Sequence, residues 1–169
     1  MPNYRRSYAG TVWFFTVVTH RRYPLFLDPV ARVCLRTAVG ECRGRFPFQI
    51  DAWVLLPDHL HAVWTLPETD TDYSRRWSVI KRRFSQRYRH AGGHGPPYWQ
   101  MRFWAHRVDD SGDYRHHLDY IHFNPVKHRL VTAVEEWPWS TFHRHVEAGI
   151  YPHDWGGAAP GFPPGTGHE

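Results

Sequence analysis

The amino-acid sequence predicts one α+β domain in which helices cover an antiparallel sheet. Its length of 169 residues suits a single domain with a sizeable core. Strand-like and helix-like apolar patterns follow one another in the order strand, helix, strand, strand, helix, strand. This is the order of a ferredoxin-like βαββαβ sandwich with its helices on one face of the sheet, here followed by a C-terminal helical extension.

The domain is expected to span residues 1–155. Residues 1–10 are polar and basic, include Arg5 and Arg6, and are expected to form an arm that leads into the first strand. Residues 156–169 are rich in glycine and proline, and we expect this tail to be disordered.

The first half of the chain supplies the first strand, the first helix and one strand of a hairpin. Residues 11–20 are β-branched and aromatic throughout, which is typical of a central strand covered on both faces. Asp28 precedes a proline and is suited to cap a helix that we expect to end between Gly40 and Gly44. Residues 46–56 alternate as a strand does. The alternation places these apolar residues on one face: Phe48, Ile50, Ala52, Val54 and Leu56.

The returning strand of the hairpin, residues 59–66, carries two histidines. A turn at Pro57 and Asp58 joins the two strands. Side chains at i and i+2 of a strand point to the same face, so His59 and His61 stand side by side opposite the apolar face. Imidazole is the commonest metal-binding side chain, and this pair is suited to one metal ion. Two incidental histidines are the alternative, since the chain has 14 of them.

A second helix is expected from about Tyr73 to Arg89, because apolar residues recur there at helical spacing. Its opposite face carries cations that have no acidic partner at i, i+4, namely Arg75, Arg76, Arg82, Arg83, Arg87 and Arg89, with Lys81 at the border. The planar guanidinium group suits bidentate contact with phosphate, so this face is a candidate for nucleic-acid binding. A solvated amphipathic face is the alternative.

Aromatic and basic residues are interleaved in the next predicted strand, residues 98–108. Trp99, Phe103 and Trp104 are candidates for stacking on unpaired bases, and Arg102 is a candidate for a phosphate contact. Buried aromatic side chains of an edge strand are an equally good interpretation of this pattern.

A third helix is expected from Gly112 to about Phe123, with Ser111 as its cap. Tyr120 and Asn124 are four residues apart and share one helix face, away from the apolar side that packs on the sheet. Added to two coplanar imidazoles, an amide and a phenol one helical turn apart would make a metal site with a nucleophile beside it. The alternative is a structural tyrosine at the edge of an apolar stripe.

Composition favours a polyanionic partner and a reducing compartment. Lys and Arg exceed Asp and Glu by 21 to 16, which gives a net charge of +5. No apolar stretch approaches the roughly 20 residues of a membrane span, and no secretory signal is recognisable. Cys34 and Cys42 lie eight positions apart on the first predicted helix, too far for a disulfide. We therefore expect a cytoplasmic protein with no membrane partner.

Nearly the whole chain resembles the REP-associated tyrosine transposases, a branch of the single-tyrosine HUH transposases found with bacterial insertion sequences. The stretches that carry the resemblance are Tyr4-Arg5-Arg6, Phe14-Phe15-Thr16, Leu56-Pro57-Asp58-His59-Leu60-His61, Tyr120-Ile121-His122-Phe123-Asn124-Pro125-Val126-Lys127 and Trp137-Pro138-Trp139-Ser140. The resemblance implies that His59 and His61 are metal ligands, that Tyr120 is the nucleophile and that Asn124 is the third ligand.

The same resemblance implies transesterification of single-stranded DNA. Tyr120 would form a 5′-phosphotyrosine and free a 3′ hydroxyl, which later returns as the second nucleophile, so that no nucleotide cofactor is needed. A divalent ion, expected to be Mg²⁺ or Mn²⁺, would polarise the scissile phosphate, and the metal or Lys127 would favour the phenolate.

The implied substrates are short palindromic repeats that fold into hairpins when single-stranded. The candidate contacts to this DNA are Arg5, Arg6, Arg75, Arg76, Arg82, Arg83, Arg87, Arg102 and Lys127. We expect a bacterial cytoplasmic protein that associates with the nucleoid when it is bound to DNA. We also expect a monomer, because the long C-terminal segment would obstruct the helix exchange of more distant dimeric relatives; a dimer is the alternative.

Two other functions remain open from the sequence. A hairpin-binding regulator of the same fold would bind DNA or RNA without cutting it. A metal-dependent hydrolase would use the two histidines to activate water and would leave no covalent adduct. The spacing of Tyr120 and Asn124 argues against both, because neither function requires a phenol at that place.

Overall fold

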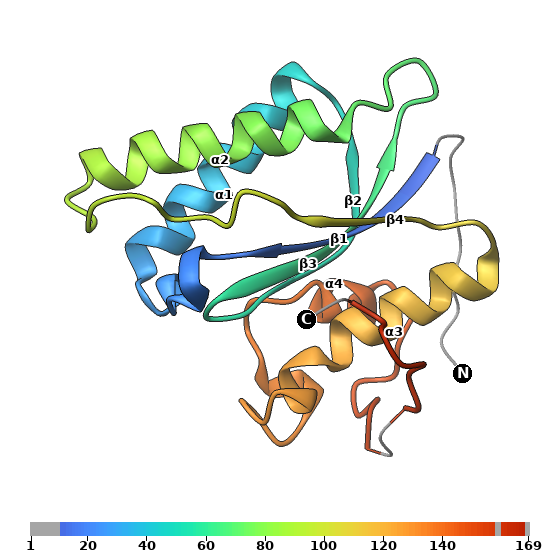
Figure 1. The fold of residues 1–169 in the computed structure, drawn as a ribbon. Helices are drawn as coiled ribbons and strands as arrows, with labels where there is room; N and C mark the ends of the chain where they lie inside the picture. The colour runs from blue at the N-terminus through green and yellow to red at the C-terminus, as the bar shows by residue number, and fades with distance from the viewer. Residues whose placement is uncertain (1–10, 158–159, 168–169) are drawn as a thin grey trace.

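The computed structural model describes residues 11–157 and 160–167, so the basic arm with Arg5 and Arg6 lies outside the described residues. The elements are β1 (Thr11–Val18), α1 (Pro29–Arg45), β2 (Gln49–Leu55), β3 (His59–Leu66), α2 (Tyr73–His90), β4 (Trp104–Arg107), α3 (Ser111–Lys127) and α4 (Phe142–Glu147), with 3-10 turns at His20–Arg22, Leu25–Leu27 and Val134–Glu136. The four strands form one antiparallel sheet in the order β2-β3-β1-β4 (Figure 1). This is the predicted ferredoxin-like α+β arrangement.

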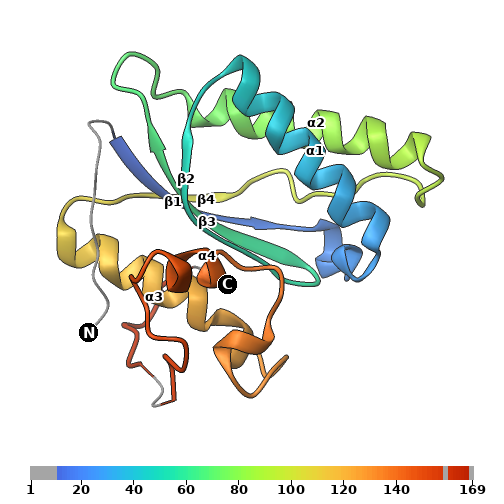
Figure 2. The same ribbon diagram turned by 180° about the vertical axis from the view of Figure 1, so that it is seen from behind.

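Helices cover both faces of this sheet. The two crossover helices, α1 and α2, lie together on one face, as the βαββαβ order predicts. On the opposite face lie α3 and the C-terminal segment that contains α4 (Figure 2). The predicted C-terminal extension therefore makes a third layer and removes from solvent a sheet face that would otherwise be open.

The middle strands carry a different core on each face. On the α1–α2 side, Leu60, Ala62 and Trp64 of β3 join one apolar cluster. On the α3 side, Phe14 of β1 joins a second cluster with Leu118 of α3. All eight residues of β3 are buried, which confirms its prediction as a central strand.

A β-bulge in β2 corrects the predicted alternation of that strand. Ile50 pairs with Trp64 whereas Ala52 pairs with Val63, so one extra residue, Asp51, is inserted between the pairs. An inserted residue reverses which face the following side chains point to. Phe48 and Ile50 therefore contact the α1–α2 core, while the apolar residues after the bulge that were expected beside them, Ala52, Val54 and Leu56, face α3.

The third helix is longer than predicted and has a different cap. Asp110, not Ser111, caps it by accepting hydrogen bonds from the N–H groups of Gly112 (2.8 Å) and Asp113 (2.9 Å). It continues through Pro125 to Lys127. Proline costs one hydrogen bond there, because it has no N–H to donate to the carbonyl one turn earlier, and that loss falls in the last turn of the helix.

The fourth strand is shorter than predicted, because its pairing with β1 is interrupted between Gln100 and Trp104. Only Trp104–Arg107 pairs with β1 as a ladder, and Trp99 makes a single bridge to Thr19. The indole of Trp99 turns into the α1–α2 core against Phe26 and Phe84. For Trp99, the alternative interpretation is therefore correct: it is a buried aromatic side chain and not a residue that stacks on a base.

The C-terminal segment packs back on the sheet at the edge of β2. The N–H of Leu55 donates to the carbonyl of Trp139 (2.9 Å), and the indole N–H of Trp137 donates to the carbonyl of Leu55 (3.0 Å). Further along, Gly167 is buried and Phe162 packs against α3, although the tail is expected from its composition to be disordered. The cysteines Cys34 and Cys42 are both free, as their spacing on α1 predicts.

Within the described residues, no helix is both long and apolar enough to cross a membrane.

Two buried histidines join α4 to α3. Nδ1 of His145 lies 3.2 Å from Nε2 of His122, which also lies 2.8 Å from the hydroxyl of Thr141. Burial and the neighbouring Arg144 lower the pKa of His145 to about 4, and burial holds the pKa of His122 well below its usual range. Both imidazoles are therefore neutral in the folded protein at neutral pH.

We predict that acidification destabilises the protein through this pair. Between about pH 6.5 and pH 4 the unfolded chain protonates His145 and the folded protein does not, so stability falls with falling pH, by about 3 kcal/mol for this residue. Urea unfolding at several pH values measures the slope. His145→Gln should flatten it, whereas His153→Gln, at an exposed histidine, should leave it unchanged; equal slopes for all three proteins would contradict the prediction.

Candidate active site

The sheet contributes a pair of histidines on β3 to the candidate site. His59 is 2% exposed and His61 is 0% exposed, and their ring centroids lie 5.0 Å apart. Both side chains point away from the α1–α2 core and toward α3, as the i, i+2 spacing predicts. Burying two imidazoles is unfavourable unless their nitrogens are hydrogen-bonded, and the structure supplies a partner for each.

Asp58 orients His59. Its Oδ1 lies 2.6 Å from Nδ1 of His59, and its Oδ2 lies 3.4 Å from the guanidinium group of Arg22. Burial raises the pKa of Asp58, but the hydrogen bond with His59 and the charges of His59 and Arg22 outweigh burial and lower this pKa below its usual value. The ionised carboxylate keeps the proton of His59 on Nδ1 and leaves Nε2 as the atom suited to a metal ion.

Thr16 orients His61 from the neighbouring strand. The two residues are directly paired between β1 and β3, and Oγ1 of Thr16 lies 2.8 Å from Nδ1 of His61. The Thr16 hydroxyl also donates to the carbonyl of Gly167, so its oxygen accepts from Nδ1–H of His61. Sequence reasoning missed Thr16 because strand register, which only the sheet supplies, places it beside the histidine.

Helix α3 packs over this pair and brings Tyr120 against His61. Tyr120 is 1% exposed, and its ring centroid lies 5.3 Å from that of His61. Asn124, one turn further along the same helix, is buried on the same side. Nζ of Lys127 donates a hydrogen bond to the phenol oxygen of Tyr120 at 3.0 Å. An ammonium group at this distance favours the phenolate over the phenol.

His128 is a further imidazole at the site that sequence reasoning missed. Its ring centroid lies 5.1 Å from that of His59, at the end of α3. The available signal was its spacing, since residue 128 is four positions after Asn124 and eight after Tyr120, on the same side of the helix.

The C-terminal tail lies over the phenol. Phe162 packs edge-on against the ring of Tyr120, with centroids 5.3 Å apart. Thr166 contacts His116, and Gly167 lies so close to the phenol oxygen that a Cβ added to it would overlap Tyr120. In this conformation residues 162–167 cover the ring and the oxygen of Tyr120.

The donor set suits a divalent metal ion. His59, His61 and Asn124 are buried on the α3 side of the sheet, and each imidazole has its Nδ1 engaged by Asp58 or Thr16. Two imidazoles and an amide are neutral, so they leave the charge of an ion available to an anionic ligand.

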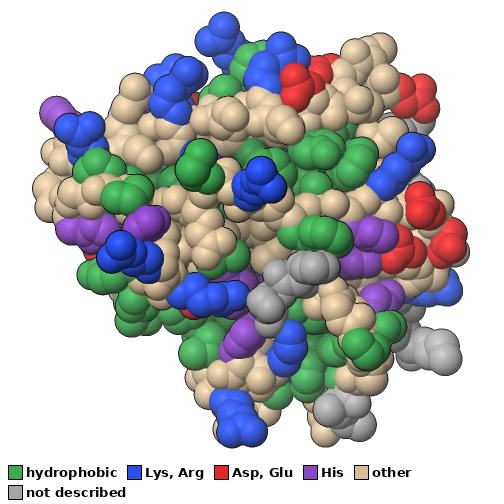
Figure 3. Space-filling view, in the orientation of Figure 1, with side chains coloured by type: hydrophobic (Ala, Val, Ile, Leu, Met, Phe, Trp, Pro, Cys, Tyr) green, Lys and Arg blue, Asp and Glu red, His purple; other side chains and the backbone are tan. Residues whose placement is uncertain are grey.

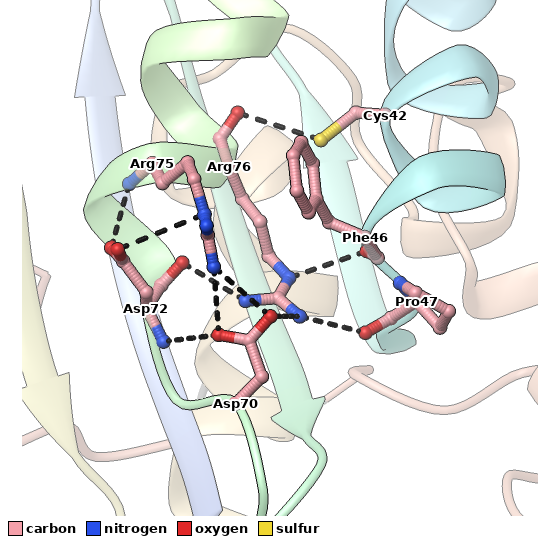
Figure 4. Close-up of polar contacts among 7 residues, drawn as sticks. All are labelled: Cys42, Phe46, Pro47, Asp70, Asp72, Arg75 and Arg76. Carbon is pink, nitrogen blue, oxygen red and sulfur yellow. Dashed lines mark hydrogen bonds and ion pairs between the residues drawn. The ribbon is translucent and has the colours of Figure 1, made fainter.

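One of the arginines predicted to bind nucleic acid is a structural residue. Arg76 is 0% exposed, and its guanidinium group donates to the carbonyls of Phe46 (3.3 Å), Pro47 (2.9 Å) and Asp72 (2.9 Å) (Figure 4). It also pairs with the carboxylate of Asp70 at 3.2 Å. Because these groups surround the guanidinium, Arg76 is not available to phosphate. The prediction that Arg76 contacts DNA is therefore wrong.

The other predicted arginines of α2 lie on the opposite side of the sheet from the histidines (Figure 1). Arg75 pairs with Asp70 and Asp72, and Arg83 and Arg87 both pair with Glu41 of α1. These acidic partners come from outside α2, which is why i, i+4 spacing missed them. Exposed members of the face, such as Arg82, keep the predicted role as a proposal.

The aromatic candidates divide between the two faces. Trp99 is in the α1–α2 core, and Phe103 packs against the same core. Trp104 is 40% exposed and pairs directly with Thr16, which places it on the α3 face with Thr16 between it and His61. Of the three, Trp104 is the residue best placed to meet a base near the site. Arg102, in the segment before β4, is exposed.

A ferredoxin-like sheet with two buried histidines on its middle strand, facing a helix that carries a tyrosine, defines a protein of the tyrosine transposase class. Comparison with known proteins identifies the family within this class. The chain is 48% identical over 166 residues to the REP-associated tyrosine transposase of Escherichia coli (strain K12), covering 98% of this chain and 97% of that protein. A protein of Haemophilus influenzae, provisionally given the same name, is 40% identical over 172 residues, covering 93% of this chain and 94% of the relative. The chain belongs to the family of REP-associated tyrosine transposases.

Solved structures agree with this assignment. A REP-associated tyrosine transposase bound to a REP hairpin superposes with a TM-score of 0.80 at 47% identity, over 96% of this chain and 95% of that one. A provisionally named transposase of Deinococcus radiodurans shares only the fold, with a TM-score of 0.50 at 16% identity over 67% of this chain and 91% of that one. No protein-family model matches the chain.

We predict that Arg76 contributes to stability and not to DNA affinity. Arg76→Met should lower the free energy of unfolding by about 3 kcal/mol, because three carbonyls lose their donor and Asp70 loses one of its two arginine partners. Arg82→Met, at an exposed position of the same helix, should change it by less than about 0.5 kcal/mol. Denaturant unfolding tests both. Arg76→Met with wild-type stability and weakened hairpin binding would restore the original interpretation.

Proposed function

We propose that this protein is a metal-dependent single-stranded DNA endonuclease and strand transferase that acts on palindromic repeat hairpins through a covalent 5′-phosphotyrosine. The observation that carries the proposal is the position of Tyr120, whose ring lies 5.3 Å from His61 and whose oxygen accepts a hydrogen bond from Lys127 at 3.0 Å. A phenol between an imidazole pair and an ammonium group is suited to nucleophilic attack on phosphorus.

Tyr120 is the proposed nucleophile and Lys127 the group that activates it. A free phenol with a pKa near 10 is a poor nucleophile at neutral pH. The ammonium group of Lys127 stabilises the phenolate, which then attacks phosphorus and releases the 3′ oxygen. The covalent bond formed at Tyr120 replaces the phosphodiester bond that is broken, so the returning 3′ hydroxyl rejoins the strand without a nucleotide cofactor.

His59, His61 and Asn124 are the proposed metal ligands. A divalent ion bound there, Mg²⁺ or Mn²⁺ in our proposal, supplies Lewis-acid polarisation of the scissile phosphate. Asp58 and Thr16 engage Nδ1 of the two rings, which leaves Nε2 of each ring as the proposed ligand atom. His128 is a proposed positioning residue, since its ring packs against that of His59.

The proposed substrate is hairpin-forming single-stranded DNA. A relative that is 47% identical was solved bound to a REP hairpin. In this chain Trp104 offers an exposed ring on the side of the sheet that carries Thr16 and His61, and Lys127 offers a charge beside Tyr120. Arg5, Arg6, Arg75, Arg82, Arg83, Arg87 and Arg102 remain proposed contacts along the DNA backbone.

We propose a cytoplasmic monomer with a single catalytic domain over residues 1–155. The position of the C-terminal segment supports the proposal of a monomer. Residues 139–141 pair with the outer edge of β2, so this edge is not available for pairing with a strand of a second chain.

We predict a covalent adduct that requires Tyr120. The protein is incubated with end-labelled hairpin oligonucleotides, including the repeats of its own host, and with Mg²⁺ or Mn²⁺, and the products are separated in SDS. Wild type should give an SDS-resistant protein–DNA band, and Tyr120→Phe, which removes only the oxygen, should give none.

Three results would contradict this mechanism. Tight hairpin binding without an adduct across the whole panel would favour a regulator that does not cut DNA. Cleavage with free phosphate ends and no adduct would favour hydrolysis by activated water. An adduct retained in Tyr120→Phe would assign the nucleophile to another residue.

We predict that Lys127 acts by charge. Lys127→Met should slow single-turnover adduct formation by about 100-fold at neutral pH, the size typical of a lost catalytic group, and the rate of this variant should rise as pH increases toward the range in which free phenols ionise. Lys127→Arg should keep most of the wild-type rate. If both variants lose hairpin affinity and keep their single-turnover rate, Lys127 binds DNA and does not activate Tyr120.

A further inference from the structure

A second cluster of metal-binding side chains lies where the chain passes from β4 into α3. Its members are His106 of β4 and Asp113 and His117 of α3. The space-filling view shows histidine side chains beside acidic ones on that side of the molecule (Figure 3). Among the described residues, this is the group of His, Cys, Asp and Glu side chains close enough together to bind one metal ion.

The three side chains meet at the carboxylate of Asp113. Nε2 of His106 lies 2.9 Å from Oδ2, and Nδ1 of His117 lies 3.0 Å from Oδ1. The two imidazole rings are stacked, with centroids 4.9 Å apart. One nitrogen from each ring therefore contacts a different oxygen of the same carboxylate, and the three donor atoms lie within 4.8 Å of one another.

The surrounding backbone holds these donors in place. The N–H of Asp109 donates to Oδ2 of Asp113 at 3.2 Å, which orients the carboxylate from behind. His117 is buried against Phe14, with ring centroids 4.5 Å apart, and His106 pairs directly with Phe14 on β1. His106 is partly exposed, so solvent and ions reach the cluster from the side of β4.

The cluster is separate from the proposed active site. Phe14 lies between the two, because its ring is 5.6 Å from that of His61 on one side and 4.5 Å from that of His117 on the other. None of its three residues is among the proposed ligands of the catalytic ion.

We propose that His106, Asp113 and His117 form a second metal site, which binds Zn²⁺ or a similar borderline divalent cation. Two imidazoles and one carboxylate are a common protein donor set for zinc, with a fourth position left for water. Each set has two imidazoles, but the third donor here is an anionic carboxylate, whereas Asn124 offers a neutral amide beside His59 and His61, so the two sites differ in the ions that they prefer.

Binding requires each imidazole to change its tautomer. Nε2 of His106 lies 2.9 Å from a carboxylate oxygen of Asp113, which can only accept, so this nitrogen carries a proton, and coordination through it moves that proton to Nδ1 of His106. Nδ1 of His117 also lies 2.9 Å from the backbone carbonyl of Asp113, so it carries the proton in the structure described here. Coordination through Nδ1 moves that proton to Nε2 of the same ring and replaces the hydrogen bond to the carbonyl with a metal bond. The imidazole stays neutral, and Asp113 supplies the negative charge that the cation needs.

The site would fasten the edge strand to the helix that carries Tyr120. Four residues of β4 pair with β1, so this strand has few backbone hydrogen bonds of its own. A metal ion bound by His106, Asp113 and His117 would hold the first two turns of α3 against the sheet. Asp113 and His117 lie seven and three residues before Tyr120 on that helix. The ion is a positioning element in this proposal and does not touch the reacting atoms.

The test measures metal binding apart from catalysis. His59→Ala/His61→Ala removes the proposed catalytic ligands, and this double variant is titrated with Zn²⁺ and, as a spectroscopic probe, with Co²⁺. We expect one tightly bound ion per chain, a visible Co²⁺ absorption band typical of nitrogen and oxygen ligands, and a rise in melting temperature on binding. This result does not depend on whether the protein cuts DNA.

Single substitutions assign the ligands. Adding His106→Gln or Asp113→Asn to the double variant should weaken Zn²⁺ binding by at least roughly 100-fold and abolish the Co²⁺ band, since loss of a ligand costs more than loss of a group behind one. His90→Gln, at an exposed histidine of α2, should change neither.

Three outcomes would overturn the proposal. They are the absence of stoichiometric Zn²⁺ binding in the double variant, binding that survives both substitutions, and binding lost equally in the His90→Gln control. The cluster would then be a hydrogen-bonded triad in which Asp113 joins two histidines without an ion. Circular dichroism of each variant verifies that it is folded, and His106 lies at a partly exposed edge where substitution is tolerated best.

Discussion

The structure depends on one strand that is buried on both faces. Every residue of β3 is inaccessible, yet only one of its faces is apolar. The other face holds two imidazoles, whose desolvation costs about 1–3 kcal/mol for each polar group left without a partner. Asp58 and Thr16 offset this cost by binding the Nδ1 atoms, and the same two hydrogen bonds orient rings that contact Tyr120 and His128 of the α3 layer. Stability and site geometry therefore come from the same contacts.

Strand register extends this arrangement across the sheet. His61 pairs with Thr16, and Thr16 pairs with Trp104, so three neighbouring strands place these side chains in one row on the α3 face. The next row contains Val63, Phe14 and His106. Phe14 thus lies between the two groups of histidines, against His61 on one side and His117 on the other. An apolar ring at that place keeps two groups of histidines apart on one sheet face.

The third helix faces both groups. Asp113 and His117 lie in its first two turns, and Tyr120, Asn124 and Lys127 lie in its last turns, so a shift of the helix would disturb every proposed function at once. The helix is held by its Asp110 cap, by the apolar contacts of Leu118 and Ile121, and by residues 162–167, which cover Tyr120 from outside.

Local pattern in the sequence was enough to predict the order of elements, the central strands, the helix cap at Asp28 and the shared face of His59 and His61. These follow from period-2 and period-3.6 spacing and from backbone preferences, which neighbouring residues alone decide. Sequence could not predict the bulge at Asp51, the burial of Arg76, the pairing of Arg83 and Arg87 with Glu41, or the partnership of Thr16 with His61. Each of these depends on groups that are far apart along the chain and meet only when strand register and helix packing bring them together.

The spacing of residues thus determined which groups this protein offers for chemistry. The tertiary structure decided which of those groups meet, because burial and hydrogen bonding are properties of the packed chain.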